Sequence, residues 1–309
     1  MTGGIFPRFG EFTDPQASRF AVLASLLKEA ALPHRALSLE KSRHFFIHPE
    51  QNPERGKKDP AEAGKKSPAG FGSRLPQTVL VAHYDRSEGS PGANDNSAAV
   101  LILIEAAKKL LREGEKNWLI IFTDHEEVPG GGSLEDQGSF ALARFLKEKG
   151  FAGSDFFIFD CCGTGDTLIV STTAGQLLKE KEGGGSDRMR RALAGVRERV
   201  LKTVRDLFLD RILLAPTPFS DDPGFLRAGI AAQTITCLPA SEATTLARAL
   251  RRRPELLDYL VHRQDEKKSD LSFFPPVWRR INSPADTERY LTPEYFDQVE
   301  RLALALCRG

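Results

Sequence analysis

Acidic and imidazole side chains gather at the ends of apolar stretches in this sequence. His83 ends one stretch, Glu126 and Glu127 come shortly after a second, Asp160 ends a third, and Asp95 lies in a Gly- and Asn-rich loop. Imidazole nitrogen and carboxylate oxygen bind Zn²⁺ and can leave one coordination position for water. Carboxylates brought together at the ends of buried strands are costly unless a cation compensates them. These residue types therefore predict a metal site.

The three apolar stretches are typical of buried central strands. We predict strands at residues 79–82, 118–123 and 155–160, and helices between them at residues 97–111 and 140–149. In an open α/β sheet the binding crevice lies beyond the carboxyl ends of the strands. The predicted strands would therefore deliver the chemically active side chains to one edge of the sheet.

The rest of the chain extends the same pattern. We predict a helix ending near residue 31, two short strands within residues 35–48, strands at 167–171 and 230–237, and helices at 187–209, 244–262 and 293–307. Strands separated by helices of ~10–20 residues predict an α/β three-layer sandwich with a central, mainly parallel mixed sheet. We expect a single domain over residues 1–309, with a mobile surface loop at residues 49–77, where Pro, Gly, Lys and Glu are frequent.

Composition is that of an ordinary globular protein. The chain is 40% hydrophobic and 28% charged, with a formal net charge of +1 at pH 7. This balance gives no attraction to nucleic acid or to an anionic membrane, and no segment has the ~18 consecutive apolar residues of a membrane span. Because the first twelve residues lack the apolar core of a secretory signal, we expect a cytoplasmic protein. Its four cysteines are expected to be buried thiols.

Short motifs along the chain resemble those of the bacterial leucyl aminopeptidase family of zinc-dependent aminopeptidases. They are HYD at 83–85, GANDNSA at 92–98, FTDHEE at 122–127, GSFA at 138–141, FDCCG at 159–163, SDDPGF at 220–225 and SPADT at 283–287. The motifs occur in the family's order, and the resemblance runs from about residue 78 to the C-terminus. It implies a zinc aminopeptidase-like fold and the removal of N-terminal residues from peptides. The implied substrate is a peptide or a small amine with a free N-terminus.

The resemblance also implies a role for each matched metal-binding residue. Asp95 would bridge two zinc ions. His83 and Asp160 would complete one zinc site, and Glu127 would serve the other.

Two further carboxylates have implied roles in catalysis. Glu126 would be the general base that moves a proton to the departing amine, while zinc activates water and polarises the scissile carbonyl. Asp85 would hold the imidazole of His83 in its metal-binding orientation.

The sequence departs from the family pattern at the second zinc site. Asn282 stands where the family has a zinc-binding histidine, and Asp222 stands where a histidine usually follows Ser220 and Asp221. A neutral amide oxygen is a poorer partner for Zn²⁺ than imidazole. Three alternatives are open: a one-ion enzyme, a two-ion enzyme that borrows a ligand such as Asp222 or His262, and an inactive binding protein with the same fold. We favour at least one bound zinc ion.

A second resemblance is to the glutaminyl cyclases, which have the same fold and use one zinc ion. It rests on FPPVW at residues 274–278 and FLR at 225–227. In those enzymes a zinc-binding histidine follows the Val-Trp pair, whereas Arg279 stands there in this sequence. Trp278 is expected either to pack at the sheet edge or to form a wall of the substrate pocket. Cyclisation of an N-terminal glutamine is therefore the alternative function.

Overall fold

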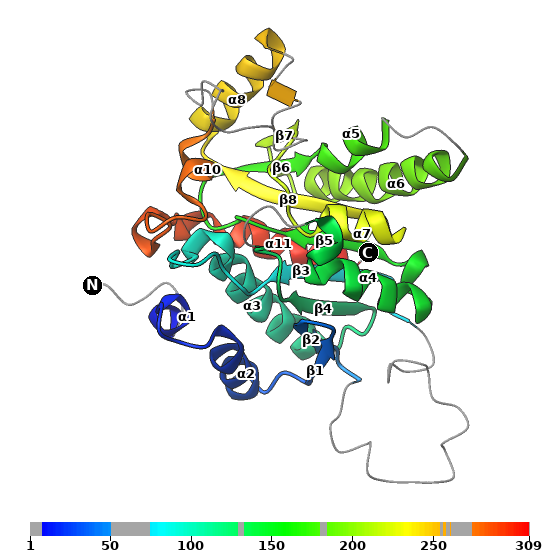
Figure 1. Ribbon diagram of the computed structural model, residues 1–309, viewed down its shortest axis with the longest axis vertical. Coiled ribbons are helices and arrows are strands. Elements are labelled where there is room, and N and C mark those ends of the chain that lie inside the picture. The colour runs from blue at the N-terminus through cyan, green and yellow to red at the C-terminus, as the bar shows by residue number, and fades with distance from the viewer. Residues whose placement is uncertain are drawn as a thin grey trace.

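The computed structural model describes residues 8–50, 75–128, 133–179, 184–253, 256–257, 260 and 274–308. Most of the loop predicted at residues 49–77 lies outside the described residues, and so does His262. One eight-stranded sheet crosses the molecule and helices cover both of its faces (Figure 1). The prediction of an α/β three-layer sandwich is confirmed. None of the helices in the described part of the chain has the length and apolar character needed to cross a bilayer.

The sheet is mixed, with a parallel centre. Its order is β1-β2-β4-β3-β5-β8-β6-β7. The strands are β1 (His34–Leu39), β2 (Ser42–Ile47), β3 (Thr78–His83), β4 (Trp118–Thr123), β5 (Asp155–Phe159), β6 (Thr167–Ser171), β7 (Ile212–Ala215) and β8 (Ala232–Leu238). Strand β3 is parallel to β4 and β5, β5 to β8, and β6 to β7. Antiparallel pairs join β1 to β2, β2 to β4 and β6 to β8, so the predicted mixed character is confirmed.

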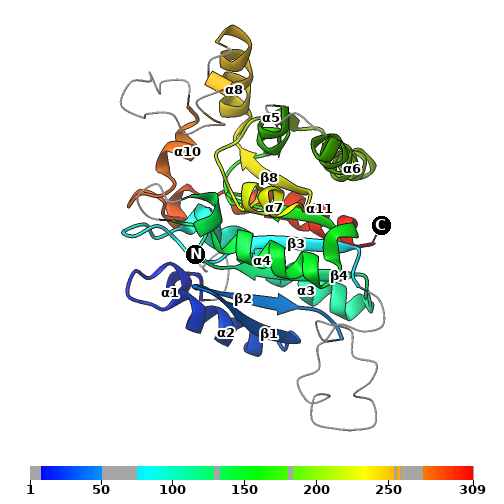
Figure 2. The ribbon, with the colours of Figure 1, turned by 45° about the vertical axis from the view of Figure 1, so that its right-hand side comes forward.

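Helices pack on the two faces of the sheet through separate cores. The α-helices are α1 (Phe9–Thr13), α2 (Arg19–Glu29), α3 (Ala98–Glu113), α4 (Gly138–Glu148), α5 (Thr173–Lys179), α6 (Gly184–Asp206), α7 (Asp222–Ala228), α8 (Ala240–Arg252), α10 (Pro276–Arg280) and α11 (Phe296–Arg308). One core joins the sheet to α2, α3, α6 and α11. The other joins it to α4 and α7, which lie across the opposite face (Figure 2).

Strand β3 shows why its sequence is continuously apolar. Leu80 and Ala82 enter the core under α3 and α11, whereas Val79 and Val81 enter the core under α4 and α7. Side chains alternate between the two faces of a strand, so a strand covered on both faces buries every residue. The chain then leaves α3 at Gly114, whose φ of 76° is the left-handed conformation that commonly ends a helix.

The strand order reverses at β3. The chain runs from β3 to β4 on one side of it and then crosses to β5 on the other side. At such a switch point the loops diverge and leave a crevice beyond the carboxyl ends of the strands. The residues that the sequence analysis selected follow β3, β4 and β5, so the topology brings them to this crevice.

Most predicted elements are present, and the differences lie at short or terminal segments. The strands predicted at 118–123 and 167–171 match β4 and β6, and the two early strands match β1 and β2. The final helix begins at Phe296, because the predicted start is a separate 3-10 turn at Pro293–Tyr295. Helix α8 ends at Arg252, and much of the predicted continuation lies outside the described residues. All four cysteines are buried free thiols, as predicted.

Candidate metal centre

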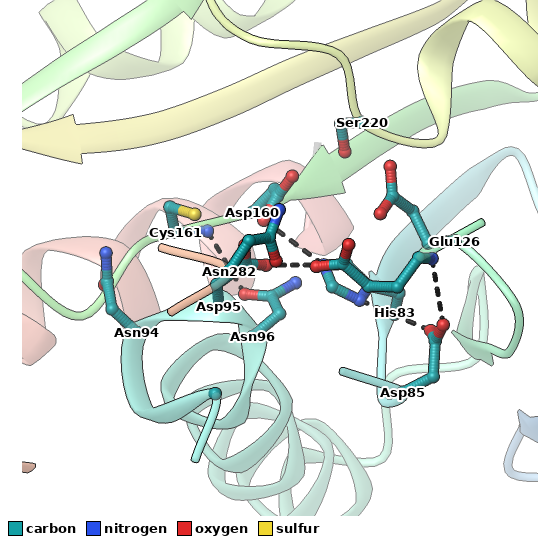
Figure 3. Close-up of polar contacts among 12 residues, drawn as sticks. His83, Asp85, Asn94, Asp95, Asn96, Glu126, Asp160, Cys161, Ser220 and Asn282 are labelled. Atoms are coloured by element: carbon teal, nitrogen blue, oxygen red, sulfur yellow. Dashed lines mark hydrogen bonds and ion pairs between the residues drawn. The ribbon is translucent and has the colours of Figure 1, made fainter. Parts of the chain in front are cut away.

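The imidazole of His83 lies at the centre of the site, at the end of β3, and is fully buried. Its Nε2 is 3.0 Å from Asp95 Oδ1 and 3.4 Å from Asp160 Oδ1 (Figure 3). Within the described residues, neither ring nitrogen of His83 nor Asp160 Oδ1 has a hydrogen-bond partner. One ligand atom from each of the three residues lies within 4.8 Å of the others. One nitrogen and two carboxylate donors at this spacing fit a zinc ion.

The charge balance around His83 favours a positive charge. Burial by itself lowers the pKa of His83, but the carboxylates of Asp160, Asp85 and Asp95 raise it well above its usual value. Burial raises the pKa of Asp95, and the neighbouring Asp160 raises it further. A cation placed among these carboxylates would relieve the same repulsion that now favours protonation.

Asp95 is positioned by a tight turn between β3 and α3. The turn, Ala93–Ser97, is buried, and the peptide bond between Asp95 and Asn96 is cis. The carboxylate of Asp286 accepts the backbone N–H groups of Asn94 at 2.9 Å and Asp95 at 3.0 Å. Asn96 donates from its side chain to the carbonyl of Phe159, which ties the turn to the end of β5. The turn is therefore held from two sides.

Arg19 anchors the same turn from the N-terminal part of the chain. Its guanidinium is buried and donates to the carbonyl oxygens of Phe12, Tyr84, Asp85, Pro91 and Gly92 and to the hydroxyl of Ser97. A guanidinium has five N–H donors in a fixed plane, so it can join several backbone segments at once. Arg19 has no local sequence signal, because its partners at the site lie 65 to 78 positions further along the chain.

Glu126 and Glu127 follow β4, with the chain turned by His125. His125 has φ of 63°, in the left-handed region that favours glycine. Glu126 is buried, and its Oε1 accepts a hydrogen bond from Gln137 Nε2 at 3.2 Å. Burial raises the pKa of Glu126 well above its usual value, and the adjacent carboxylate of Glu127 raises it further. A raised pKa makes the carboxylate a stronger base, which suits a group that transfers protons.

Glu127 and Asp85 connect the ends of β3 and β4. The backbone N–H of Glu127 donates to Asp85 Oδ2 at 3.0 Å, while Asp85 Oδ1 is 3.4 Å from His83 Nδ1. The hydroxyl of Ser87 donates to Glu127 Oε2 at 2.7 Å. Burial raises the pKa of Glu127 to about 8, and Asp95 contributes to the rise. Ser87 was not singled out in the sequence, because one loop serine has no distinguishing pattern.

A cavity opens over the cluster. Asp95, Glu126 and Asp160 line its acidic side, and its wall also includes Trp278 and Asn282. The remaining lining residues include Phe219 and Ile281. The cavity therefore joins the candidate metal ligands to an apolar surface.

Trp278 lies in the apolar core that contains Ala215 of the edge strand β7, and its role as a wall of the substrate pocket stays a prediction. Its side chain lines this cavity, and its ring also packs 5.6 Å from the ring of Phe274, measured between centroids. The indole is almost completely buried.

Asp222 lies apart from the cavity, at the start of α7. It is buried, is not among the residues that line the cavity, and neither carboxylate oxygen has a hydrogen-bond partner within the described residues. Burial raises its pKa to about 7. His262, the other residue considered as a replacement ligand, lies outside the described residues. The cluster thus contains His83, Asp95 and Asp160 but not Asp222.

Peptidase family M28 matches residues 71–307 of the chain. No curated protein matches the sequence. A leucine aminopeptidase precursor from Bacteroides thetaiotaomicron has a similar structure, with a TM-score of 0.61 and 15% identity over 100% of this chain and 97% of that one. A glutaminyl cyclase from Porphyromonas gingivalis gives a TM-score of 0.61 and 15% identity over 98% of this chain and 94% of that one. These two likenesses indicate a common fold.

The zinc aminopeptidase BSAP from Bacillus subtilis is also similar, with a TM-score of 0.48 and 19% identity over 85% of this chain and 48% of that one. The chain therefore spans about half the length of that enzyme.

Proposed function

Because the chain belongs to peptidase family M28, we propose that it is a zinc-dependent aminopeptidase, a metallohydrolase that removes N-terminal residues from peptides. The observation that carries this proposal is the cluster of His83, Asp95 and Asp160, with ligand atoms within 4.8 Å of one another. Glu126 lines the same cavity as Asp95 and Asp160. A cation site beside a buried carboxylate provides the groups needed for metal-assisted hydrolysis of an amide bond.

Three side chains would hold a zinc ion: His83, Asp95 and Asp160. Bound zinc supplies a Lewis acid that polarises a carbonyl and makes water a stronger nucleophile. Asp85, at 3.4 Å from His83 Nδ1, orients the imidazole so that Nε2 faces the cluster. The sequence resemblance would add Glu127 as the ligand of a second ion.

Glu126 is the general base in this proposal. It would take the proton of the attacking water and deliver it to the amine of the departing peptide. Its buried position and its carboxylate neighbours raise its pKa well above the usual value, so it holds a proton more strongly than an exposed glutamate does. The hydrogen bond from Gln137 fixes the carboxylate while it exchanges the proton.

The cavity supports a peptide substrate with an uncharged first residue. A free N-terminal amino group would lie at its acidic side, which Asp95, Glu126 and Asp160 line. The first side chain would contact Phe219 and Trp278. Apolar contact would supply binding energy, whereas the carboxylates would select a free amine over a blocked one.

The first test is the Glu126→Gln variant. Hydrolysis of a peptide with a free N-terminus should fall by a factor of at least about 100, because general base catalysis contributes this much. Zinc content measured on the same sample should be unchanged. Glu135→Gln serves as the control, because Glu135 is an exposed carboxylate paired with Arg227. If Glu126→Gln retains the native rate, Glu126 is not the base.

Cyclisation of an N-terminal glutamine is the second candidate function. Trp278 lines the cavity, and the chain covers 94% of the Porphyromonas gingivalis glutaminyl cyclase. A peptide that begins with glutamine separates the two reactions by product mass, since cyclisation releases ammonia and hydrolysis releases the amino acid. Neither product from the zinc-loaded protein would favour a binding protein on this fold.

Cellular location and partners stay predictions. On the near-zero net charge we propose that the protein has no nucleic-acid partner, and a cytoplasmic location stays an expectation. Retention on a nucleic-acid column at low salt would contradict the first point, and cell fractionation tests the second.

A further inference from the structure

The carboxylate of Glu127 already has hydrogen-bond donors from the chain. Ser87 Oγ donates to Glu127 Oε2 at 2.7 Å. When the NH₂ group of Asn282 faces these residues, it donates to Ser87 Oγ at 2.8 Å and to Glu127 Oε2 at 3.2 Å, and it also contacts Oε1. The opposite orientation would set the amide oxygen against the carboxylate, acceptor against acceptor. The donating orientation is therefore the stable one.

The cation cluster, in contrast, does not include Glu127. Within the described residues, one group of three His, Cys, Asp or Glu side chains has ligand atoms that all lie within 4.8 Å of one another. It consists of His83, Asp95 and Asp160. His83 Nε2 and Asp160 Oδ1 are buried there without hydrogen-bond partners, whereas Glu127 Oε2 accepts from Ser87. The atoms that still lack a partner, and that a cation would bind, are therefore those of the cluster.

The side chain at position 282 decides what lies beside Glu127. Asn282 lines the cavity and has φ of 58°, a left-handed conformation that Asn and His adopt more readily than most residues. An amide nitrogen is a hydrogen-bond donor and not a zinc ligand, and an amide oxygen binds zinc less well than imidazole does. The backbone at this position thus accepts either residue, but only a histidine would offer a strong ligand.

We infer that the site holds one divalent cation, on His83, Asp95 and Asp160, and that the Asn282 amide takes the place of a second cation as the partner of Glu127. Glu127 is then an acceptor for Ser87 and Asn282 and not a ligand. A second ion at Glu127 would have to displace the amide donor without gaining a strong ligand in return. This inference rests on the proposed zinc-dependent function.

The test is the number of zinc ions bound per chain. Protein stripped of metal with a chelator is equilibrated with excess zinc, freed of unbound metal and measured by native mass spectrometry. We expect about one ion per chain. Two ions would overturn the single-ion assignment and leave the proposed function standing. No bound ion would overturn the proposed function itself.

Variants at two positions test the reason for the single ion. Asn282→His should raise the zinc content to about two ions per chain, whereas Asn282→Gln, which keeps an amide, should leave it at about one. Glu127→Gln should also keep its single ion. Loss of that ion would identify Glu127 as a ligand and overturn the inference. A folded Asn282→His variant, judged by circular dichroism, that still binds one ion would overturn the role given to Asn282.

Discussion

Arg19 offers the sharpest test of how the N-terminal helices support the site. Its guanidinium donates to six acceptors. Two are carbonyls of the segment that follows β3, two are carbonyls just before the turn that carries Asp95, and one is the Ser97 hydroxyl within that turn. In Arg19→Met the side chain keeps much of its apolar stem but loses every donor. The carbonyls are then left buried, or water must enter to reach them.

The expected cost follows from this geometry. Losing a buried, hydrogen-bonded charge typically costs about 4 kcal/mol. For a chain of this length that corresponds to a fall of about 6 °C in the apparent Tm. Because the turn carrying Asp95 loosens, zinc affinity should also fall by a factor of about 10, as it does when groups that orient metal ligands are removed.

Arg86→Met is the matched control. Arg86 also donates to backbone carbonyls, those of Thr13 at 3.1 Å and Asp14 at 2.9 Å, but it is only half-buried, and these guanidinium hydrogen bonds do not reach the turn of Asp95. Its loss should cost about 1 kcal/mol and leave zinc affinity unchanged. Thermal melts by differential scanning fluorimetry and zinc titration by calorimetry measure both quantities. Equal effects from the two variants would refute the anchoring role of Arg19.

Three further outcomes are expected. Burial raises the pKa of Asp222 to about 7, so the folded chain keeps a proton that the unfolded chain releases, and stability is lost as pH rises from about 4 through about 7. Asp222→Asn removes this loss. The stability of the variant relative to the native chain, measured in thermal melts, should therefore rise by about 2.5 kcal/mol between pH 5 and pH 8. A difference that stays constant with pH would contradict the burial argument. Removal of zinc held at a hundredfold excess over Kd should lower the free energy of unfolding by about 2.7 kcal/mol, and with it the Tm. Asp160→Ala should abolish this zinc-dependent change in Tm. A Cβ at Gly138 would lie 2.0 Å from the carbonyl oxygen of Asp124, whereas one at Gly195 meets nothing within 4 Å. In denaturant titrations, Gly138→Ala should therefore lower the free energy of unfolding by about 2 kcal/mol, and Gly195→Ala should raise it by up to about 1 kcal/mol. Equal effects of the two substitutions would contradict the close contact at Gly138.

The core of the fold could be predicted because its signals are local. Strand β4 is a run of apolar residues with both faces covered, and α3 has apolar positions at helical spacing and a glycine at its end. Strand β7 could not be recognised, since it has four residues, mostly only half-buried, and pairs with β6 at the sheet edge. Helix α7 spans seven residues, which is too short for a clear period, although Pro223 and Gly229 mark its ends.

The candidate site also has a part that the sequence could predict and a part that it could not. His83 and Asp160 could be selected from sequence because they lie at the ends of the neighbouring parallel strands β3 and β5, and Asp95 because it lies in the loop that follows β3. The contacts of Arg19 and of Asn282 depend on packing between segments far apart in the sequence. No local sequence pattern predicts such contacts. The residues that hold the turn and those that surround Glu127 could therefore be identified only from the structure.

Peptide hydrolysis by the zinc-loaded protein tests the central claim most directly. Pairs of peptides with identical sequences, one with a free N-terminus and one acetylated, are incubated with zinc-loaded and chelator-treated protein, and the products are identified by mass spectrometry. We expect the zinc-loaded protein to remove single residues from the free peptides only. Cleavage that does not depend on zinc, cleavage of acetylated peptides, or no change in any peptide would contradict the assignment of a zinc-dependent aminopeptidase.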